Sequence, residues 1–164
     1  MTLFKSLRTD SVDTSAETDF LLRERISPQW YDFLQVLSEE MRSQLSGDEY
    51  RELLKNMGVR MAGRLGMCGK DTIEQLEDAI NQQLGRIRWG YVKLQDSGNQ
   101  LQIQHFLNPL LMGLDADRGI SGGFLEGMYE EWFRSAGADG GLSVKQNLDA
   151  STDTVLEFHF GRHA

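Results

Sequence analysis

Cysteine is almost absent from this sequence, with Cys68 the only one in 164 residues. One cysteine cannot form an intrachain disulfide, which excludes a disulfide-stapled scaffold and agrees with a reducing compartment. No apolar run approaches the ~18 to 20 residues that span a bilayer, so we do not expect an integral membrane protein. Residues 1–20 lack both a continuous apolar stretch and a small-residue cleavage site, so we expect no secretory signal and a cytoplasmic location.

Basic residues are also scarce relative to acidic ones. The chain has 17 Lys and Arg against 25 Asp and Glu, giving a net charge of −8. Nucleic acids and anionic membranes require clustered Lys and Arg, so both are disfavoured as partners. The hydrophobic share of 40% is typical of a soluble globular domain, and the length suffices for one proper core.

Residues for metal or phosphate chemistry are not grouped as such sites require. His105, His159 and His163 are too far apart for a metal-ligand motif. On its strand, His105 is expected to be half-buried and hydrogen-bonded. The run 121–123 (SGG) precedes a helix, but no lysine follows as in a phosphate-binding loop. We expect neither a metal nor a cofactor.

One acidic segment does place oxygen ligands at calcium-loop spacing. Asp115, Asp117, Gly119 and Glu126 occupy positions 1, 3, 5 and 12 of such a loop. Ile120 then occupies position 6, where the sharp turn requires glycine. A polar loop that leads into a helix is therefore the preferred interpretation.

Paired carboxylates raise the question of glycoside hydrolysis. The pairs are Glu39-Glu40 and Glu130-Glu131, and each lies beside an apolar helical stripe. Adjacent residues on a helix point in different directions, so solvated helix faces explain the pairs better than an acid and base across a sugar. No set of acid, base and nucleophile is identifiable, and we expect no enzymatic activity.

Helical periodicity dominates the first half of the chain. Ser27-Pro28 is typical of a helix start, because proline has no amide to lose at the first helical position. Apolar residues then recur at helical spacing until Gly47, which we expect to end this helix as its C′ residue. A second helix is expected from Asp48 to Leu65.

The second helix contains small residues within its apolar pattern. A glycine inside a helix costs about 1 kcal/mol relative to alanine, so close packing must offset the loss. We therefore expect this helix to approach another backbone and to serve subunit packing. The candidates for an oligomer interface are Gly58, Met61, Ala62, Gly63 and Leu65.

A third helix is expected to lead into a strand. Asp71 as N-cap and Glu74 three residues later have the capping-box spacing. Beyond Gly85 the period changes from helical to two. One strand face then carries Trp89, Tyr91, Lys93 and Gln95, and the other carries Gly90, Val92 and Leu94.

The remainder alternates between strands and one helix. A turn at 97–99 precedes a strand at 100–106, a helix is expected from about 122 to 135, and two strands are expected at 142–148 and 154–160. This order predicts an α+β fold, with four to five helices packed against antiparallel hairpins that form a small sheet. We expect exposed strand edges suited to subunit packing.

We divide the chain into a flexible polar segment, residues 1–25, and a single domain, residues 26–164. The first segment mixes Ser, Thr, Asp and Glu with a few apolar positions, which favours disorder. The alternative is a segment that orders on assembly.

Four stretches resemble the D subunit of bacterial cellulose synthase complexes. Most of the resemblance lies in Arg60–Leu65 (RMAGRL) and Leu84–Leu94 (LGRIRWGYVKL). Further support comes from Phe33–Met41 (FLQVLSEEM) and Leu125–Phe133 (LEGMYEEWF). The resemblance covers about two thirds of the chain.

The resemblance implies a non-catalytic accessory protein of cellulose synthesis that promotes ordered export or crystallisation of glucan chains. It implies a ring-like homo-octamer, a tetramer of dimers with passages for β-1,4-glucan, working with other synthase subunits and a scaffold protein. It also implies that N-termini lie near the passages, which makes Leu3, Phe4 and Lys5 candidates for glucan contact. The family has been described as periplasmic, which is the alternative to the cytoplasmic location.

Aromatic residues suggest a second group of glucan-contact candidates. Flat aromatic faces stack on sugar rings, although burial in the core or a subunit interface is the more common role. Trp89 and Tyr91 are expected to share a face with Lys93, so these three are the candidates for surface contact.

Two other functions stay open. A small-molecule-binding sensor or scaffold domain would hold its ligand in an apolar pocket between helices and sheet. A glycosidase would depend on the paired glutamates and would release soluble sugars.

Overall fold

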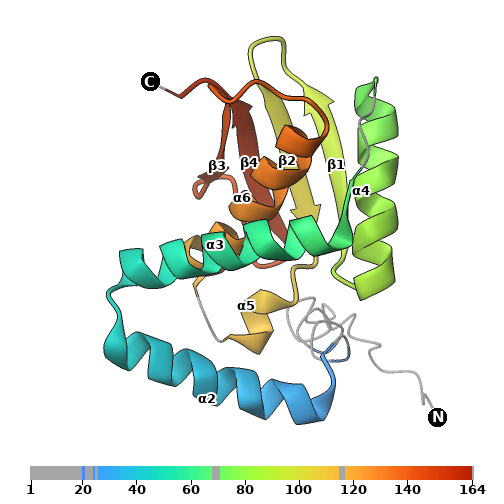
Figure 1. Ribbon diagram of the computed structural model, residues 1–164. Coiled ribbons are helices and arrows are strands. Elements are labelled where there is room, and N and C mark those ends of the chain that lie inside the picture. The colour runs from blue at the N-terminus through green and yellow to red at the C-terminus, as the bar shows by residue number, and fades with distance from the viewer. Residues whose placement is uncertain (1–19, 21–23, 25, 68–70, 115–116, 164) are drawn as a thin grey trace, which may run out of the picture.

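The computed structural model describes residues 20, 24, 26–67, 71–114 and 117–163 (Figure 1). Its helices are α2 (Pro28–Gln44), α3 (Gly47–Leu65), α4 (Ile73–Ile87), α5 (Leu110–Gly113) and α6 (Arg118–Ser135). Its strands are β1 (Tyr91–Asp96), β2 (Leu101–Phe106), β3 (Ser143–Asn147) and β4 (Val155–Gly161). The predicted α+β fold with helices against antiparallel hairpins is confirmed. Most of the expected polar segment 1–25 lies outside the described residues.

The two hairpins join into one four-stranded antiparallel sheet of order β1-β2-β4-β3. The central contact pairs β2 with β4, so that Ile103 lies opposite Phe158. In β1, Val92 is buried while its neighbours Tyr91 and Lys93 are exposed, as the two-residue period predicted. The sheet thus has an inner face against the helices and an outer face.

Helix α6 lies on the inner face of the sheet, and α3 crosses over α6 on the other side (Figure 1). A helix covered on two sides is buried nearly all round, and every residue of α6 from Ser121 to Tyr129 is buried. Its largest side chains fill the space between α6 and the sheet. They are Tyr129, Trp132 and Phe133, and they pack with Ile103, Leu156 and Phe158.

Glycines allow α3 and α6 to approach closely. A Cβ atom on Gly58 of α3 would collide with the backbone carbonyl of Phe124 in α6. One on Gly127 of α6 would collide with the carbonyl of Lys55 in α3. The close approach that the small residues predicted is therefore made within the chain itself.

The edge strand β1 is covered by side chains of α4. Asn81 accepts a hydrogen bond from the amide of Val92 at 2.7 Å and donates one to the Val92 carbonyl at 3.0 Å. Glu77 accepts from the amide of Leu94 at 2.7 Å. These side chains replace the missing neighbouring strand, so β1 is not the exposed edge that we expected.

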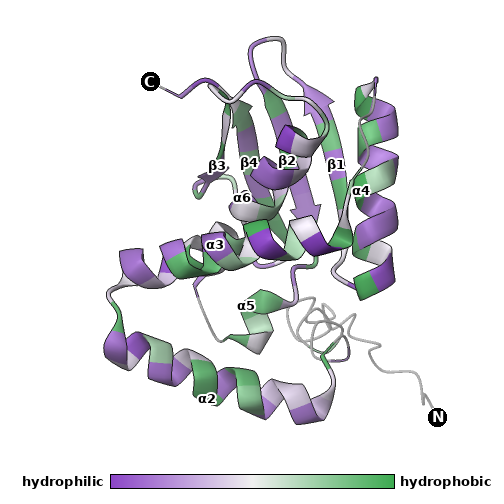
Figure 2. Cartoon of the chain, in the orientation of Figure 1, coloured by the Kyte–Doolittle hydropathy of each residue, from purple (hydrophilic) through white to green (hydrophobic). Residues whose placement is uncertain are grey.

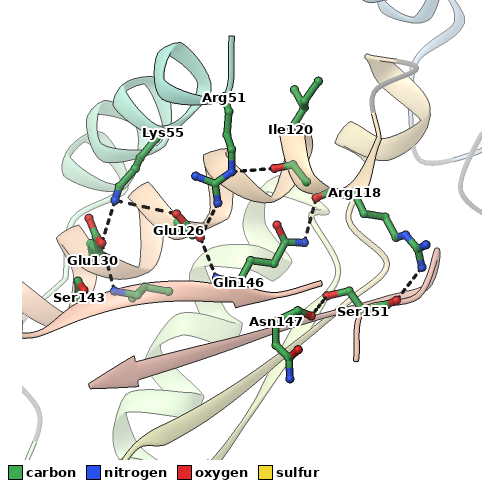
Figure 3. A network of polar contacts seen from close by, with 12 residues as sticks. Arg51, Lys55, Arg118, Ile120, Glu126, Glu130, Ser143, Gln146, Asn147 and Ser151 are labelled. Carbon is green, nitrogen blue, oxygen red and sulfur yellow. Dashed lines mark hydrogen bonds and ion pairs between the residues drawn. The ribbon is translucent and has the colours of Figure 1, made fainter. Parts of the chain in front are cut away.

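The other edge, β3, is covered by carboxylates of α6 (Figure 3). Glu126 accepts from the amide of Gln146 at 2.8 Å, and Glu130 accepts from the amide of Val144 at 3.1 Å. The spacing of four residues between the glutamates matches alternate amides along the strand. The expectation of exposed strand edges was therefore wrong at both sides of the sheet.

Two predicted helix ends also differ from the structure. Gly47 does not end the first helix but begins α3, because Ser46 and Glu49 form a capping box there. The N-cap of α4 is Thr72 rather than Asp71, since the Thr72 hydroxyl accepts the amide hydrogen bond.

Candidate assembly and binding surfaces

Helix α2 extends along one side of the molecule, separated from the sheet by α3 and α5 (Figure 1). The side chain of Gln35 donates to the carbonyl of Met112 in α5 at 2.7 Å. The Tyr50 hydroxyl of α3 donates to the hydroxyl of Ser38 at 3.1 Å, and both side chains are buried. These contacts hold one face of α2 and leave the opposite face without a partner among the described residues.

The free part of α2 carries large apolar side chains, and Figure 2 shows apolar bands along this helix. Trp30, Phe33 and Val36 are 55%, 54% and 64% exposed. The rings of Trp30 and Phe33 meet edge to face, with centroids 5.7 Å apart. Exposed apolar side chains gathered on one helix are typical of an interaction surface. We call these three residues the α2 patch.

The predicted interface residues of α3 fall into two groups. Gly58 and Ala62 are buried in the chain, so their small size is explained by the chain's own packing. Met61 and Leu65 are half-buried and pack against the core. Gly63 is exposed, and a Cβ atom there would have no neighbour within 4 Å. Of the five, Gly63 is thus the most accessible to a second copy of the chain.

The predicted glucan-contact residues are not all brought together. Leu3, Phe4 and Lys5 lie outside the described residues. Trp89 precedes β1 and is half-buried. The centroid of its ring lies 5.0 Å from that of Phe124. The expectation that Trp89 shares the exposed face of Tyr91 was wrong, because the strand begins only after Gly90, whose φ is +78°.

Tyr91 and Lys93 do lie on the outer face of the sheet. Tyr91 is 43% exposed and stacks on Phe106 of β2, with ring centroids 4.5 Å apart and planes 2° from parallel. Lys93 forms an ion pair with Glu77 at 2.9 Å. Hydrogen bonds to Lys93 and to the backbone of Leu94 outweigh the effect of burial and lower the pKa of Glu77.

Glu157 of β4 organises the polar part of the outer face. Its carboxylate accepts from the side chains of Gln102 at 2.7 Å, Asn147 at 3.0 Å and Gln104 at 3.5 Å. The ring of His159 lies 3.3 Å from the same carboxylate. Burial raises the pKa of Glu157, but these hydrogen bonds outweigh burial and hold the pKa below its usual range.

Sequence reasoning missed most of this outer-face group. The alternation of Gln102 and Gln104 along their strand was visible, but it indicated only a wet face. The cross-strand register that brings Glu157 between them, and Phe106 beside Tyr91, depends on β2 pairing with both β1 and β4. The turn at 97–99 predicted the β1–β2 hairpin, but no local pattern encodes the pairing of β2 with β4.

The carboxylates of α6 on the inner side, Glu126 buried and Glu130 half-buried, are engaged in structural contacts (Figure 3). Arg51 of α3 forms an ion pair with Glu126 at 2.5 Å, and Lys55 forms one with Glu130 at 3.0 Å. The same two glutamates hold the amides of β3. Glu126, the last residue of the calcium-loop spacing, therefore uses its carboxylate in contacts that hold α3 and β3 to α6. Asp115, the first residue of that spacing, lies outside the described residues.

The described part of the chain offers no grouped ligands for a metal ion. Within residues 26–67, 71–114 and 117–163, no three His, Cys, Asp or Glu side chains are placed so that they could hold one. Nor does any helix described there have the length and apolarity needed to cross a membrane.

Comparison with known sequences gives a consistent family. The family model for the D subunit of cellulose synthase matches residues 16–160. A cellulose synthase operon protein D from Komagataeibacter xylinus is 36% identical over 127 residues, covering 75% of this chain and 81% of that protein. A protein of the same name from Komagataeibacter sucrofermentans is 35% identical over the same lengths.

Among solved structures, the fold is similar to a trafficking protein particle complex subunit 3 from Naegleria fowleri, a protein solved covalently bound to palmitic acid. The TM-score is 0.54 at 9% identity, covering 92% of this chain and 97% of that one, which shows a shared fold alone. The sequence matches decide the family: this chain belongs to the family of cellulose synthase D subunits.

Proposed function

We propose that this chain is a non-catalytic accessory subunit of a bacterial cellulose synthase complex, and that it promotes the ordered assembly, export or crystallisation of glucan chains. The α2 patch is the observation that supports this proposal most directly. An accessory subunit acts by holding other components in place, and it requires a surface for doing so. The buried carboxylate of Glu126 and the half-buried one of Glu130 support the non-catalytic role, because structural contacts occupy both of them.

We propose that this chain forms a homo-octamer, a tetramer of dimers, and that the α2 patch joins two copies into its dimer unit. About half of each patch side chain is exposed, and an aromatic side chain buries roughly 150–250 Å² when fully covered. Covering the exposed half of Trp30 or Phe33 would therefore contribute about 2 to 3 kcal/mol each at ~25 cal/mol per Å². In a two-fold contact both copies contribute the same residues, so each residue's contribution to the binding free energy is doubled. The total suffices for a stable pair when shape complementarity is good.

The role is tested in a cellulose-producing bacterium from which the gene for this chain has been removed. We expect the native chain to restore ordered cellulose fibres, and the double variant Trp30→Ser, Phe33→Ser to fail. Leu148→Ser is the matched control, because Leu148 is 54% exposed and lies in the turn between β3 and β4 rather than on α2. Full restoration by the double variant would contradict the proposed role of the patch.

The alternative of a small-molecule-binding domain also has a feature in its favour. A hollow of about 280 Å³ lies between the start of α4, the end of α6 and the ends of β2 and β4. Its apolar lining includes Ile73, Leu76, Leu101, Phe133 and Phe160. A chain that stays monomeric in solution would favour this alternative over the octamer.

The proposed partners are other synthase subunits, a scaffold protein and the glucan itself. Cytoplasmic action beside the membrane-bound complex stays a prediction, with the periplasm as its alternative. Fractionation of cells that carry the native gene distinguishes the two compartments, since recovery in a periplasmic extract would overturn the cytoplasmic assignment.

A further inference from the structure

The outer face of the sheet remains accessible in the folded chain. Its exposed side chains are Tyr91, Lys93, Gln95 and Lys145, and its half-buried ones are Gln102, Gln104, Phe106, Ser143, Asn147, Val155 and His159. Among the described side chains of this face only Glu157 is buried, at 8% exposure. The inner face, in contrast, is closed by α6. The fold therefore displays one flat, mostly polar surface with a pair of aromatic rings at one end.

The aromatic pair forms a fixed platform. Phe106 covers one face of the Tyr91 ring in a nearly parallel stack, and in the described part of the chain no other ring packs against Tyr91. Tyr91 is also 43% exposed, so part of its side chain is open to a ligand. Because Phe106 already restrains the ring, little side-chain entropy remains to be lost on binding.

The amides beside the platform are fixed as well. Gln102 and Gln104 each donate through their side-chain nitrogen to Glu157. An amide group has two N–H donors and a carbonyl acceptor, so each glutamine keeps one donor and its acceptor for a ligand. The side chain of Gln95, opposite Gln102 in the register, makes no hydrogen bond with any described residue. The surface therefore offers neutral donors and acceptors in a row.

The electrostatics beside the platform favour a neutral ligand, whereas the exposed Lys145 lies on β3, at the opposite edge of the sheet from β1. The carboxylate of Glu157 is satisfied by three amides and a histidine, and Lys93 is paired with Glu77. An anionic ligand would meet Glu157 and Glu77, while a cationic one would compete with bonds that are already made. Sugar hydroxyls need neither charge, and they exchange hydrogen bonds with amides readily.

We propose that the outer face is a binding site for an extended β-linked glucan chain. One sugar ring stacks on Tyr91, and the hydroxyl edges of the following rings bond with Gln104, Gln102 and Gln95. The row from Tyr91 to Gln95 covers about 14 Å along the strand, which suits a chain of several sugar rings. This inference rests on the proposed function, since it names where the exported polymer touches the subunit.

The test is calorimetric titration of the full native assembly with cellohexaose, with maltohexaose as the α-linked control of equal composition. We expect binding of cellohexaose only. We expect Tyr91→Ala to weaken binding roughly two- to twelvefold, the range that an aromatic stacking contact of about 0.5 to 1.5 kcal/mol gives. Tyr91→Phe should keep most of the affinity, and Leu148→Ala all of it. Gln104→Ala supplies a second loss that does not depend on the aromatic platform.

Three results would overturn this proposal. They are an absence of cellohexaose binding, an affinity of the Tyr91→Ala variant equal to that of the native chain, and a change in assembled mass in that variant. The last result would assign the face to a second copy of the chain. None of them alters the outcome expected for the α2 variants in cells, so failure here is distinct from failure of the accessory role.

Discussion

The crossing of α3 over α6 predicts opposite effects for two glycines on the same helix. In Gly58→Ala, the new Cβ atom would collide with the carbonyl oxygen of Phe124, and it would also lie 2.9 Å from that carbonyl's carbon and 3.0 Å from the amide of Met128. All three are backbone atoms, so the helices must separate. Such overpacking costs about 1 to 3 kcal/mol, and a gain of about 1 kcal/mol in helix propensity offsets part of this cost.

Gly63→Ala is the matched control, because it adds the same methyl group where nothing lies within 4 Å. We expect Gly58→Ala to lower the free energy of unfolding by up to about 2 kcal/mol and Gly63→Ala to raise it by up to about 1 kcal/mol. Urea unfolding followed by circular dichroism, at one fixed protein concentration, measures both. Stabilisation by both substitutions would refute the claim that Gly58 exists for the α3–α6 contact.

Two further predictions concern buried polar groups. Arg51→Met should cost about 3 kcal/mol of folding free energy, because it leaves the buried carboxylate of Glu126 without its closest cation. Glu126→Gln should cost less, since Arg51 is 30% exposed and can be hydrated. Equal costs of the two substitutions in urea unfolding would contradict this reasoning. Burial lowers the pKa of His105 to about 4, so the unfolded chain binds a proton more readily and stability falls as the pH decreases from about 6.5 toward 4, by about 3 kcal/mol in all. His105→Gln should flatten this loss above about pH 4.5, where Glu77 and Glu157 still keep their charge, and an unchanged pH profile would rule His105 out as its source.

The sequence was sufficient for elements whose patterns are local. The period of two in β1 placed Val92 inside and Tyr91 outside, as the structure has them. The helical pattern from Gly122 to Ser135 located α6, although its start is at Arg118 because Asp117 caps it. Such signals survive because hydrophobic periodicity reflects the burial of each element separately.

Contacts between segments that are distant in the chain could not be predicted from the sequence. The small residues of α3 indicated a close backbone, but only the fold shows that α6 of the same chain provides it. Glu126 and Glu130 were interpreted as solvated helix residues or calcium-loop spacing, whereas they hold the amides of β3. His105 is fully buried rather than half-buried, because Tyr129 lies 2.7 Å from its Nδ1 atom across the sheet–helix layer.

The candidate surfaces illustrate the same limit. Trp30 and Phe33 lie within the apolar pattern that predicted this helix, yet α2 turns a different face toward α5 and leaves both side chains more than half exposed. An amphipathic pattern says that a face needs a partner, but it does not say whether the partner is the same chain. The Tyr91–Phe106 stack likewise required the register of β1 with β2.

The most direct test of the account is the mass of the untagged full chain in solution, measured by light scattering after gel filtration. Each chain has a mass of 18.6 kDa, so the proposed octamer predicts a peak near eight times that value, about 149 kDa. The double variant Trp30→Ser, Phe33→Ser should form a smaller species, while Leu148→Ser should keep the native mass. A native chain that elutes near 18.6 kDa at micromolar concentration would contradict assembly through the α2 patch and favour the ligand-binding alternative.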